Sequence, residues 1–130
     1  MKRILLLLLA VLPILSGCRG TAVDITYQQI TQENAKMMMD EQNVVILDVR
    51  EQEEYNSGHI PGAILLPVGT IRKDTAAAVI PEIDSTVLVY CRSGNRSTKA
   101  SEALVELGYT NIYEFGGIST WPYEVEHPQN

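Results

Sequence analysis

The sequence predicts an α/β fold with a parallel sheet, and three observations support this prediction. Continuous apolar runs at 44–47 and 87–89 are typical of parallel strands that are covered on both faces. Segments of helical periodicity alternate with these runs, which is the pattern of βα units. Hydrophobic residues make up 45% of the 130 residues, which is enough for one packed domain with its own core.

The first half of this domain is expected to contain two helices and three short strands. Thr31 is well placed to cap the first helix, because a threonine side chain can accept a hydrogen bond from the first turn. The expected elements are an edge strand within 25–30, a helix from Thr31 to Met39, a strand at 44–47, a polar helix at 51–57, a turn at 58–62 and a strand at 63–66.

The second half is organised around one strand, one loop and one helix. Apolar residues recur at helical spacing from Ala100 to Leu107, and Gly108 follows as a helix-ending residue. The expected elements are short helices within 69–80, a strand at 86–90, a helix at 98–107, a strand at 111–113, a turn at 115–118 and a short helical piece that carries Trp121. Residues 124–130 are expected to form a frayed tail.

The N-terminus has the pattern of an export signal. Lys2 and Arg3 precede an apolar run at 4–15, which is too short to span a bilayer. Small residues directly before Cys18 resemble the bacterial lipoprotein signal, in which that cysteine becomes the lipidated first residue. The resemblance implies a signal peptide at 1–17 and a lipidated tether at 18–25. The alternative is an ordinary cleaved signal with a chance cysteine.

This pattern implies an extracytoplasmic lipoprotein that is anchored to a bacterial membrane. Cleavage before Cys18 leaves 8 basic and 16 acidic residues, so the mature net charge is −8. An acidic chain is not drawn to anionic lipid, and the acyl chains must therefore provide the anchor. The acidic composition also gives no sign of the clustered basic residues that nucleic-acid binding requires.

Cys91 is then the one thiol of the mature chain that has no partner in its own sequence. In an oxidising compartment such a thiol is expected to be reactive or to form an intermolecular link. A dithiol mechanism is excluded. A metal site is not expected either, because Cys91 with the distant His59 and His127 does not supply a ligand set.

The position of Cys91 predicts an activated thiol. It ends an apolar strand, and Asp48 ends another, at the sheet edge where ligands bind in parallel α/β folds. Unpaired N–H groups of the following loop and helix turn attract anions and lower the pKa of a thiol among them. Arg92 and Arg96 add positive charge. The alternative is a small buried hydrophobic residue at a strand end, as many free cysteines are.

Taken together, these motifs resemble a single-domain rhodanese across residues 26–123. The matching segments keep the same order along the chain and are Leu47-Asp-Val-Arg50, Glu54-Tyr55, Gly58-His-Ile-Pro-Gly-Ala63, Pro67, Val87-Leu-Val-Tyr-Cys-Arg-Ser-Gly-Asn-Arg-Ser97, Ala100, Leu104, Gly108-Tyr109, Gly116-Gly-Ile118 and Trp121. The resemblance implies a five-stranded parallel sheet with helices on both faces. It also implies that Cys91 alternates between a thiol and a persulfide.

The resemblance further implies a sulfurtransferase that needs no cofactor. Cys91 would attack the outer sulfur of a small anionic donor such as thiosulfate, in two covalent steps. A thiol or cyanide would accept the sulfur, and a thioredoxin-like protein is one candidate acceptor. The arginines would attract the donor, and the loop would hold the persulfide through its N–H groups. The loop residues concerned are Arg92, Ser93, Gly94, Asn95, Arg96 and Ser97.

Four further polar residues lie in the matching segments, and of these Asp48 and Arg50 are expected to support the site. Asp48 is expected to accept hydrogen bonds from the neighbouring backbone. Arg50 and Glu54 lie four residues apart and are expected to pair locally. His59 is expected to bond to backbone in its loop, since a thiolate that the loop has already formed needs no general base.

Two other functions remain open at this point. Thiol phosphatases and arsenate reductases also use a cysteine and an arginine on an anion-binding loop. Related cell-cycle phosphatases have one more residue between the two than the four that separate Cys91 from Arg96, and the shorter loop favours a single sulfur atom over a phosphoryl group. The other alternative is a non-catalytic binding module.

Overall fold

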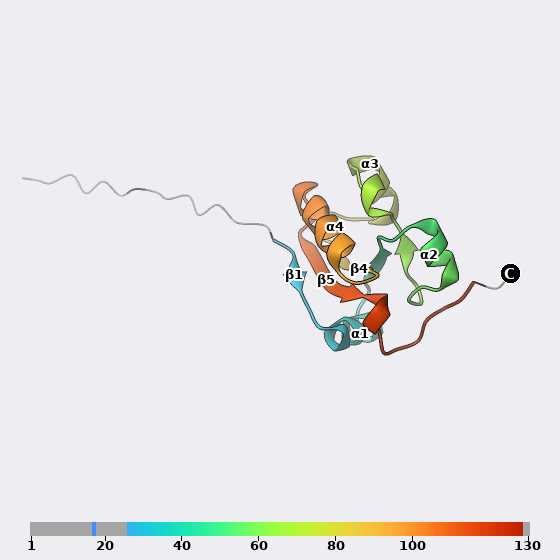
Figure 1. Cartoon of the computed structure of the whole chain (residues 1–130). Coiled ribbons are helices and arrows are strands. Elements are labelled where there is room, and N and C mark those ends of the chain that lie inside the picture. Colours follow the sequence, from blue (N-terminus) through green and yellow to red (C-terminus); the bar gives the residue numbers. More distant parts are fainter. Residues whose placement is uncertain (1–16, 18–25, 129–130) are drawn as a thin grey trace, which may run out of the picture.

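The protein is described by a computed structural model that covers Gly17 and residues 26–128 (Figure 1). The remainder of the predicted signal peptide, the tether at 18–25 and Cys18 itself lie outside these residues. Within the described part of the chain, no helix combines the length and the apolar character that a membrane span requires.

The described chain forms five strands and four α-helices. The strands are β1 (Gln28–Gln29), β2 (Val45–Asp48), β3 (Ile64–Leu65), β4 (Thr86–Cys91) and β5 (Asn111–Gly117). The helices are α1 (Gln32–Glu41), α2 (Gln52–Ser57), α3 (Lys73–Val79) and α4 (Asn95–Glu106), with 3-10 turns η1 (Val68–Thr70) and η2 (Ile118–Thr120). The side chain of Thr31 caps α1 by accepting from the Asn34 amide at 3.1 Å, as the sequence predicts.

The strands form one parallel sheet in the order β1-β5-β4-β2-β3. The strand that carries Cys91, β4, is the central one and is paired on both sides. Its apolar run is fully buried at Val87 and Val89, and each such valine contributes about 1.5–3 kcal/mol of hydrophobic free energy. The predicted five-stranded parallel sheet is confirmed.

Helices cover both faces of this sheet (Figure 1). On one face, Ala76 of α3 and Leu104 of α4 pack with Val87 and Val89. On the other face, Ala35 of α1 packs in a cluster of buried residues that includes Leu88, Tyr90, Phe115 and Trp121. Alternate residues of β4 therefore belong to different clusters, as the two-residue period of a strand requires.

Two boundaries around the thiol differ from the sequence prediction. Helix α4 begins at Asn95 rather than at residue 98, because Gly94 adopts a left-handed conformation with φ 114° and ends the loop. Strand β5 continues to Gly117, so the turn predicted at 115–118 is wrong. Phe115 is buried in the core, and Gly117 pairs with Cys91. Trp121 directly follows η2 and caps it.

The C-terminal segment also differs from the expected frayed tail. Glu126 and His59 form an isolated antiparallel bridge, with two backbone hydrogen bonds of 2.9 and 2.8 Å. The His127 ring nitrogen Nδ1 lies 3.0 Å from the Ser57 carbonyl oxygen. These contacts hold the segment against the end of α2 as far as His127.

Candidate active site

The fold places Cys91 at the carboxyl end of the central strand, where the chain leaves the sheet for the loop that leads to α4. Its side chain is 1% exposed and belongs to the core cluster that α4 covers. The thiol is free. A buried thiol at this sheet edge is surrounded by backbone groups that the turn has left without partners.

The loop after Cys91 lies directly on β5, and Gly117 makes that contact possible. A Cβ atom at Gly117 would lie 1.9 Å from the Arg92 carbonyl oxygen, so no other residue fits there without moving the loop. The Ser119 amide donates to the same oxygen at 3.1 Å. The pairing register shifts between Val89 and Cys91, and this irregularity helps to turn the chain away from the sheet.

The loop provides the hydrogen bonds that favour a thiolate. The Gly94 amide donates to Sγ of Cys91 at 3.0 Å. Burial alone raises the pKa of the Cys91 thiol, but hydrogen bonds from the Ser97 side chain and from the amides of Ser97, Gly94 and Ser93 outweigh burial. The net result is a pKa below the ordinary value. Hydrogen bonds, rather than arginine charges, are the largest causes that lower it.

Ser97 is the loop side chain that lies closest to the sulfur in this network. It is fully buried, and its Oγ lies 3.4 Å from Sγ. The side chains of Ser93 and Asn95 are exposed, and Asn95 begins α4. The structure therefore brings Cys91, Gly94 and Ser97 together, whereas Ser93 contributes through its backbone.

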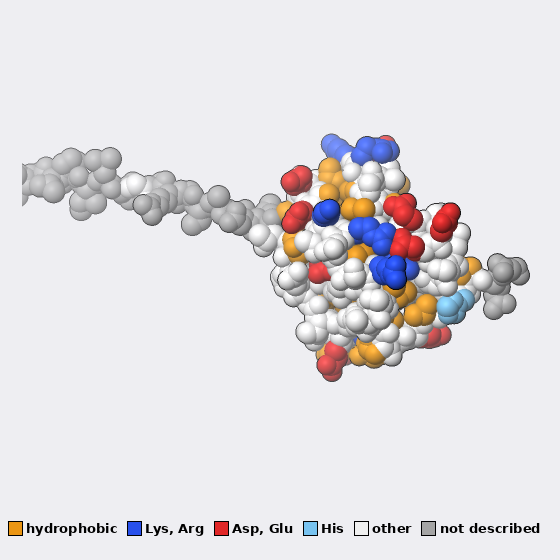
Figure 2. Space-filling view, viewed as in Figure 1, with side chains coloured by type: hydrophobic (Ala, Val, Ile, Leu, Met, Phe, Trp, Pro, Cys, Tyr) orange, Lys and Arg blue, Asp and Glu red, His pale blue; other side chains and the backbone are white. Residues whose placement is uncertain are grey.

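The two loop arginines have different surroundings. The Arg96 guanidinium donates to both carboxylate oxygens of Glu54 in α2, at 2.7 and 2.8 Å. These bonds lower the pKa of Glu54 to about 2. Arg92 is exposed at the rim of a cavity of about 390 Å³ that Arg50, Glu54 and Ser119 also line. Basic and acidic side chains adjoin on this face, between α4 and α2 (Figure 2).

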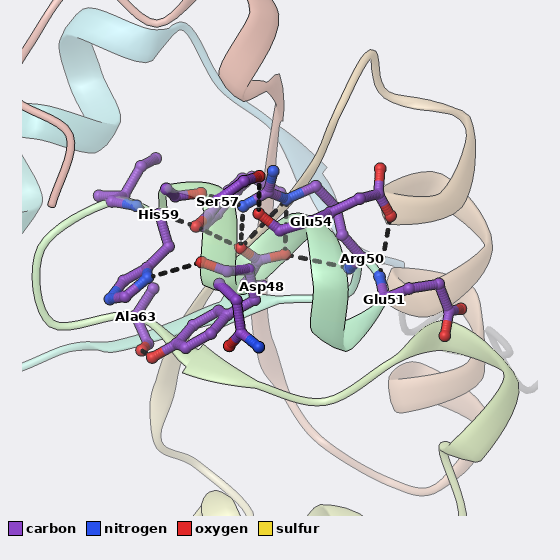
Figure 3. Close-up of polar contacts among 12 residues, drawn as sticks. Asp48, Arg50, Glu51, Glu54, Ser57, His59 and Ala63 are labelled. Atoms are coloured by element: carbon purple, nitrogen blue, oxygen red, sulfur yellow. Dashed lines mark hydrogen bonds and ion pairs between the residues drawn. The ribbon is translucent and has the colours of Figure 1, made fainter. Parts of the chain in front are cut away.

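Asp48 and Arg50 form a buried ion pair below this rim (Figure 3). Arg50 Nη2 donates to Asp48 Oδ2 at 2.7 Å and also to the Gly58 carbonyl oxygen at 2.7 Å. The Arg50 amide donates to Asp48 Oδ1 at 3.0 Å, which confirms that Asp48 accepts from the neighbouring backbone. The predicted pair of Arg50 with Glu54 is wrong, because each residue has another partner.

His59 bonds to backbone, as expected from the sequence. Its Nδ1 lies 3.0 Å from the Tyr55 carbonyl oxygen, and its ring stacks on the Tyr55 ring with centroids 3.8 Å apart. Among residues 26–128, the structure groups no three metal-binding side chains together.

Glu114, a buried carboxylate behind the loop, was not predicted from the sequence. It lies in β5 on the same face as Ile112, and its Oε1 accepts from the Ser97 hydroxyl at 2.6 Å and from the Gly116 amide at 2.8 Å. The sequence does contain a signal for its burial: Glu114 lies two residues after Ile112, and this spacing places both side chains on the same, core-facing side of a strand. Because the predicted strand ended at Tyr113, Glu114 was not recognised as a strand residue.

Comparison with known proteins agrees with this architecture. The model of the rhodanese-like domain matches residues 31–123. The chain belongs to the rhodanese-like family. It is 42% identical over 72 residues to thiosulfate sulfurtransferase PspE of Escherichia coli, an alignment that covers 55% of this chain and 68% of that protein. It is 33% identical over 103 residues to thiosulfate sulfurtransferase GlpE of Coxiella burnetii, covering 78% and 92% respectively.

Solved rhodanese structures share the fold. The structure described as rhodanese with anions from E. coli superposes with a TM-score of 0.61 at 34% identity, and covers 66% of this chain and 100% of its own. Solved structures therefore share the fold of this domain, and the resemblance noted in the sequence is confirmed at the level of the family.

Proposed function

We propose that this protein is a sulfurtransferase that moves a sulfane sulfur from thiosulfate, or a related donor, to a thiophilic acceptor through a persulfide on Cys91. The main observation in support is the thiol itself. It ends the central strand, accepts a hydrogen bond from the Gly94 amide at 3.0 Å, and has a lowered pKa. The names of the related sulfurtransferases support the same class of donor.

The proposed reaction has two covalent steps. The Cys91 thiolate attacks the outer sulfur of thiosulfate, forms a new S–S bond and expels sulfite with the electron pair of the broken bond. The product is the persulfide anion on Cys91, next to the amides of the loop. An acceptor thiolate or cyanide then attacks the outer sulfur and returns Cys91 as a thiolate. Each step replaces one anion by another, so the loop can stabilise both.

Arg92 is the residue that we assign to donor attraction. It is exposed beside the cavity, whereas the charge of Arg96 is already paired with Glu54. This assignment refines the expectation that both arginines attract the donor. Since the bridge to Glu54 holds Arg96, Arg96 serves to fix the start of α4 relative to α2. The same pairing argues against a phosphatase, in which the loop arginine must be available for the phosphoryl group.

The location proposed for the protein is the extracytoplasmic face of a bacterial membrane, with lipid on Cys18 as the anchor. The support is the signal pattern before Cys18 and the acidic composition of the remaining chain. A Cys18→Ser variant should leave the membrane fraction. A variant that stays there would show that another anchor exists. The acceptor at that location would be a small thiol or a thioredoxin-like protein.

The test of the reaction is the intact mass of the chain without residues 1–18 after incubation with thiosulfate. A gain of one sulfur atom that cyanide removes, and that Cys91→Ser lacks, is the expected result. No gain, together with turnover of phosphate esters or arsenate, would favour the phosphatase or arsenate reductase alternative. No activity in any of these assays would leave a non-catalytic binding module.

A further inference from the structure

The cavity beside the reactive loop has one charged side chain whose charge no neighbour balances. Three charged residues line this cavity, namely Arg50, Glu54 and Arg92. Arg50 is paired with the buried Asp48, and Glu54 is paired with Arg96. Arg92 is exposed and forms no salt bridge within residues 26–128. The charges within each pair cancel, so the wall of the cavity presents the single positive charge of Arg92.

The charge of Arg96 is already balanced by the acidic groups around it. Its guanidinium donates to both carboxylate oxygens of Glu54, at 2.7 and 2.8 Å. The hydrogen bond to Glu54, together with the charges of Glu54, the Cys91 thiolate and Glu51, raises the pKa of Arg96 against the opposing effect of burial. The Glu54 carboxylate is ionised above its pKa of about 2. Near neutral pH, Arg96 is therefore neutralised by its own neighbours and does not balance the charge of a donor.

The charge of the sulfur donor then becomes important. Thiosulfate carries two negative charges, whereas an organic thiosulfonate, R–SO₂–S⁻, carries one because an organic group replaces an oxygen. Both compounds present an outer sulfur to Cys91. Coulomb repulsion from Glu54 and from the thiolate grows in proportion to the charge of the donor, so it opposes thiosulfate more strongly. The half-buried side chain of Ile118 lines the same cavity and can contact the organic group.

We propose that Glu54 is a specificity-determining residue, which disfavours a dianionic donor and directs the site toward organic thiosulfonates. It does so by adding a negative charge to the cavity wall and by pairing with Arg96. In the transfer step, which rests on the proposed function, the Cys91 thiolate attacks the outer sulfur of the thiosulfonate. A new S–S bond forms on Cys91, the bond between the two sulfur atoms of the donor breaks, and a sulfinate leaves with its electron pair. One monoanion enters the cavity and one leaves it.

The charge preference can be measured with anions that transfer no sulfur. Sulfate carries the charge of thiosulfate, and methanesulfonate carries the charge of a thiosulfonate. An anion that occupies the cavity should slow the alkylation of Cys91 by iodoacetamide, and the dependence of the rate on its concentration gives its dissociation constant. The full chain is used at constant ionic strength, and mass spectrometry of the Cys91 peptide separates this thiol from Cys18.

The Glu54→Gln variant should bind sulfate more tightly by roughly tenfold and methanesulfonate by about threefold, because removal of one charge acts in proportion to the charge of the anion. A glutamine oxygen can still accept from the Glu51 amide, which donates to Glu54 Oε2 at 2.9 Å in the unsubstituted protein, so the cap of α2 is kept. The matched control is Glu53→Gln, which removes the same charge from an exposed position of α2 that does not line the cavity. It should change either dissociation constant by less than about twofold, because solvent screens an exposed charge.

Three results would overturn this inference. Equal effects of Glu54→Gln and Glu53→Gln on sulfate binding would mean that only the overall charge of α2 matters. Unchanged or weaker sulfate binding in Glu54→Gln would mean that the bridge to Arg96 favours a dianion. Protection of Cys91 by neither sulfate nor methanesulfonate would mean that the cavity binds no anion.

Donor kinetics separate this inference from the proposed function. With thiosulfate and methanethiosulfonate as donors, the ratio of their kcat/KM values should move toward thiosulfate by about threefold in Glu54→Gln and stay constant in Glu53→Gln. Comparing ratios removes the difference in intrinsic reactivity between the donors. Sulfur transfer with an unchanged ratio would overturn the inference and leave the proposed function intact. If neither donor transfers sulfur to Cys91 while Glu54→Gln still strengthens sulfate binding selectively, the proposed function is wrong and the charge preference of the cavity stands.

Discussion

Two arginine–carboxylate pairs flank the reactive loop, and they differ in how much water reaches them. Asp48 and Arg50 are two residues apart, and their side chains are 0% and 5% exposed. Glu54 and Arg96 come from different helices, and both side chains are 30% exposed. A buried pair cannot open without leaving a charge away from solvent, whereas a half-exposed pair can exchange its partner for water.

The buried pair is also part of a larger hydrogen-bonded network. Tyr90, the residue before Cys91, donates its hydroxyl proton to Asp48 Oδ2 at 2.6 Å and accepts from the Ile60 amide at 3.1 Å. Burial raises the pKa of Tyr90, and its hydrogen bond to Asp48 adds to that effect, so the hydroxyl stays a neutral donor. The network joins the ends of β2 and β4 to the loop at 58–60. It therefore fixes the sheet edge from which Cys91 projects.

The largest effect should follow from breaking the buried pair on one side. Arg50→Met leaves the Asp48 carboxylate buried without a cation, and this should lower the free energy of unfolding by about 3–5 kcal/mol. Denaturant unfolding measures the loss. The double variant Asp48→Leu with Arg50→Met should be less destabilised than Arg50→Met alone, because no charge is left unpaired. A loss below about 1 kcal/mol in Arg50→Met would mean that water reaches this pair as well.

A smaller effect should follow from removing one hydroxyl from the network. Tyr90→Phe leaves the Ile60 amide without an acceptor and takes one donor from Asp48, at a cost of about 1–3 kcal/mol. The matched control is Tyr109→Phe, since Tyr109 is also buried, and burial raises the pKa of its hydroxyl with no hydrogen-bond partner contributing among residues 26–128. Equal unfolding free energies for the two variants would show that the hydroxyl of Tyr90 is not part of the support for the sheet edge.

The half-exposed pair should contribute less. A double-mutant cycle of Glu54→Gln and Arg96→Gln should give a coupling energy of about 0.5–1 kcal/mol, because solvent screens both partners. Raising the salt concentration should reduce it further. The same cycle at Lys36 and Asp40, an exposed pair within α1, provides a reference for a surface contact. A coupling energy of several kcal/mol would mean that the Glu54–Arg96 pair contributes to stability as a buried pair does.

The sequence predicted most of the fold because the relevant signals are local. The apolar run of β4, the glycine in the loop and the helix behind it all lie within a few residues of Cys91, and the lowered pKa of its thiol follows from that local geometry. The same holds for the cap at Thr31. Parallel pairing then follows from the alternation of strands and helices.

The partners of the arginines were harder to predict because they depend on tertiary structure. The four-residue spacing of Arg50 and Glu54 suggests a helical pair, but α2 begins only after Glu51, and Arg50 turns back to Asp48. The partner of Arg96 is 42 residues away in sequence, on another helix. Glu114 was missed for a related reason, since its burial follows from the full length of β5.

The smallest expected effect, and the one that most directly separates the two pairs, is a dependence on acid. Hydrogen bonds from Arg96 lower the pKa of Glu54 from its ordinary value of 4.5 to about 2, against the opposing effect of burial. Because the pKa of Glu54 is lower in the folded protein than in the unfolded chain, the stabilisation from this pair is complete above pH 4.5. It is lost as the pH falls toward 2. The difference in unfolding free energy between the unsubstituted protein and Glu54→Gln should therefore be constant near neutral pH and shrink only within that acid window. If the difference instead disappeared above 4.5, Arg96 would not hold the Glu54 carboxylate in the folded protein, and the bridge between α2 and the reactive loop would be a contact that solvent readily replaces.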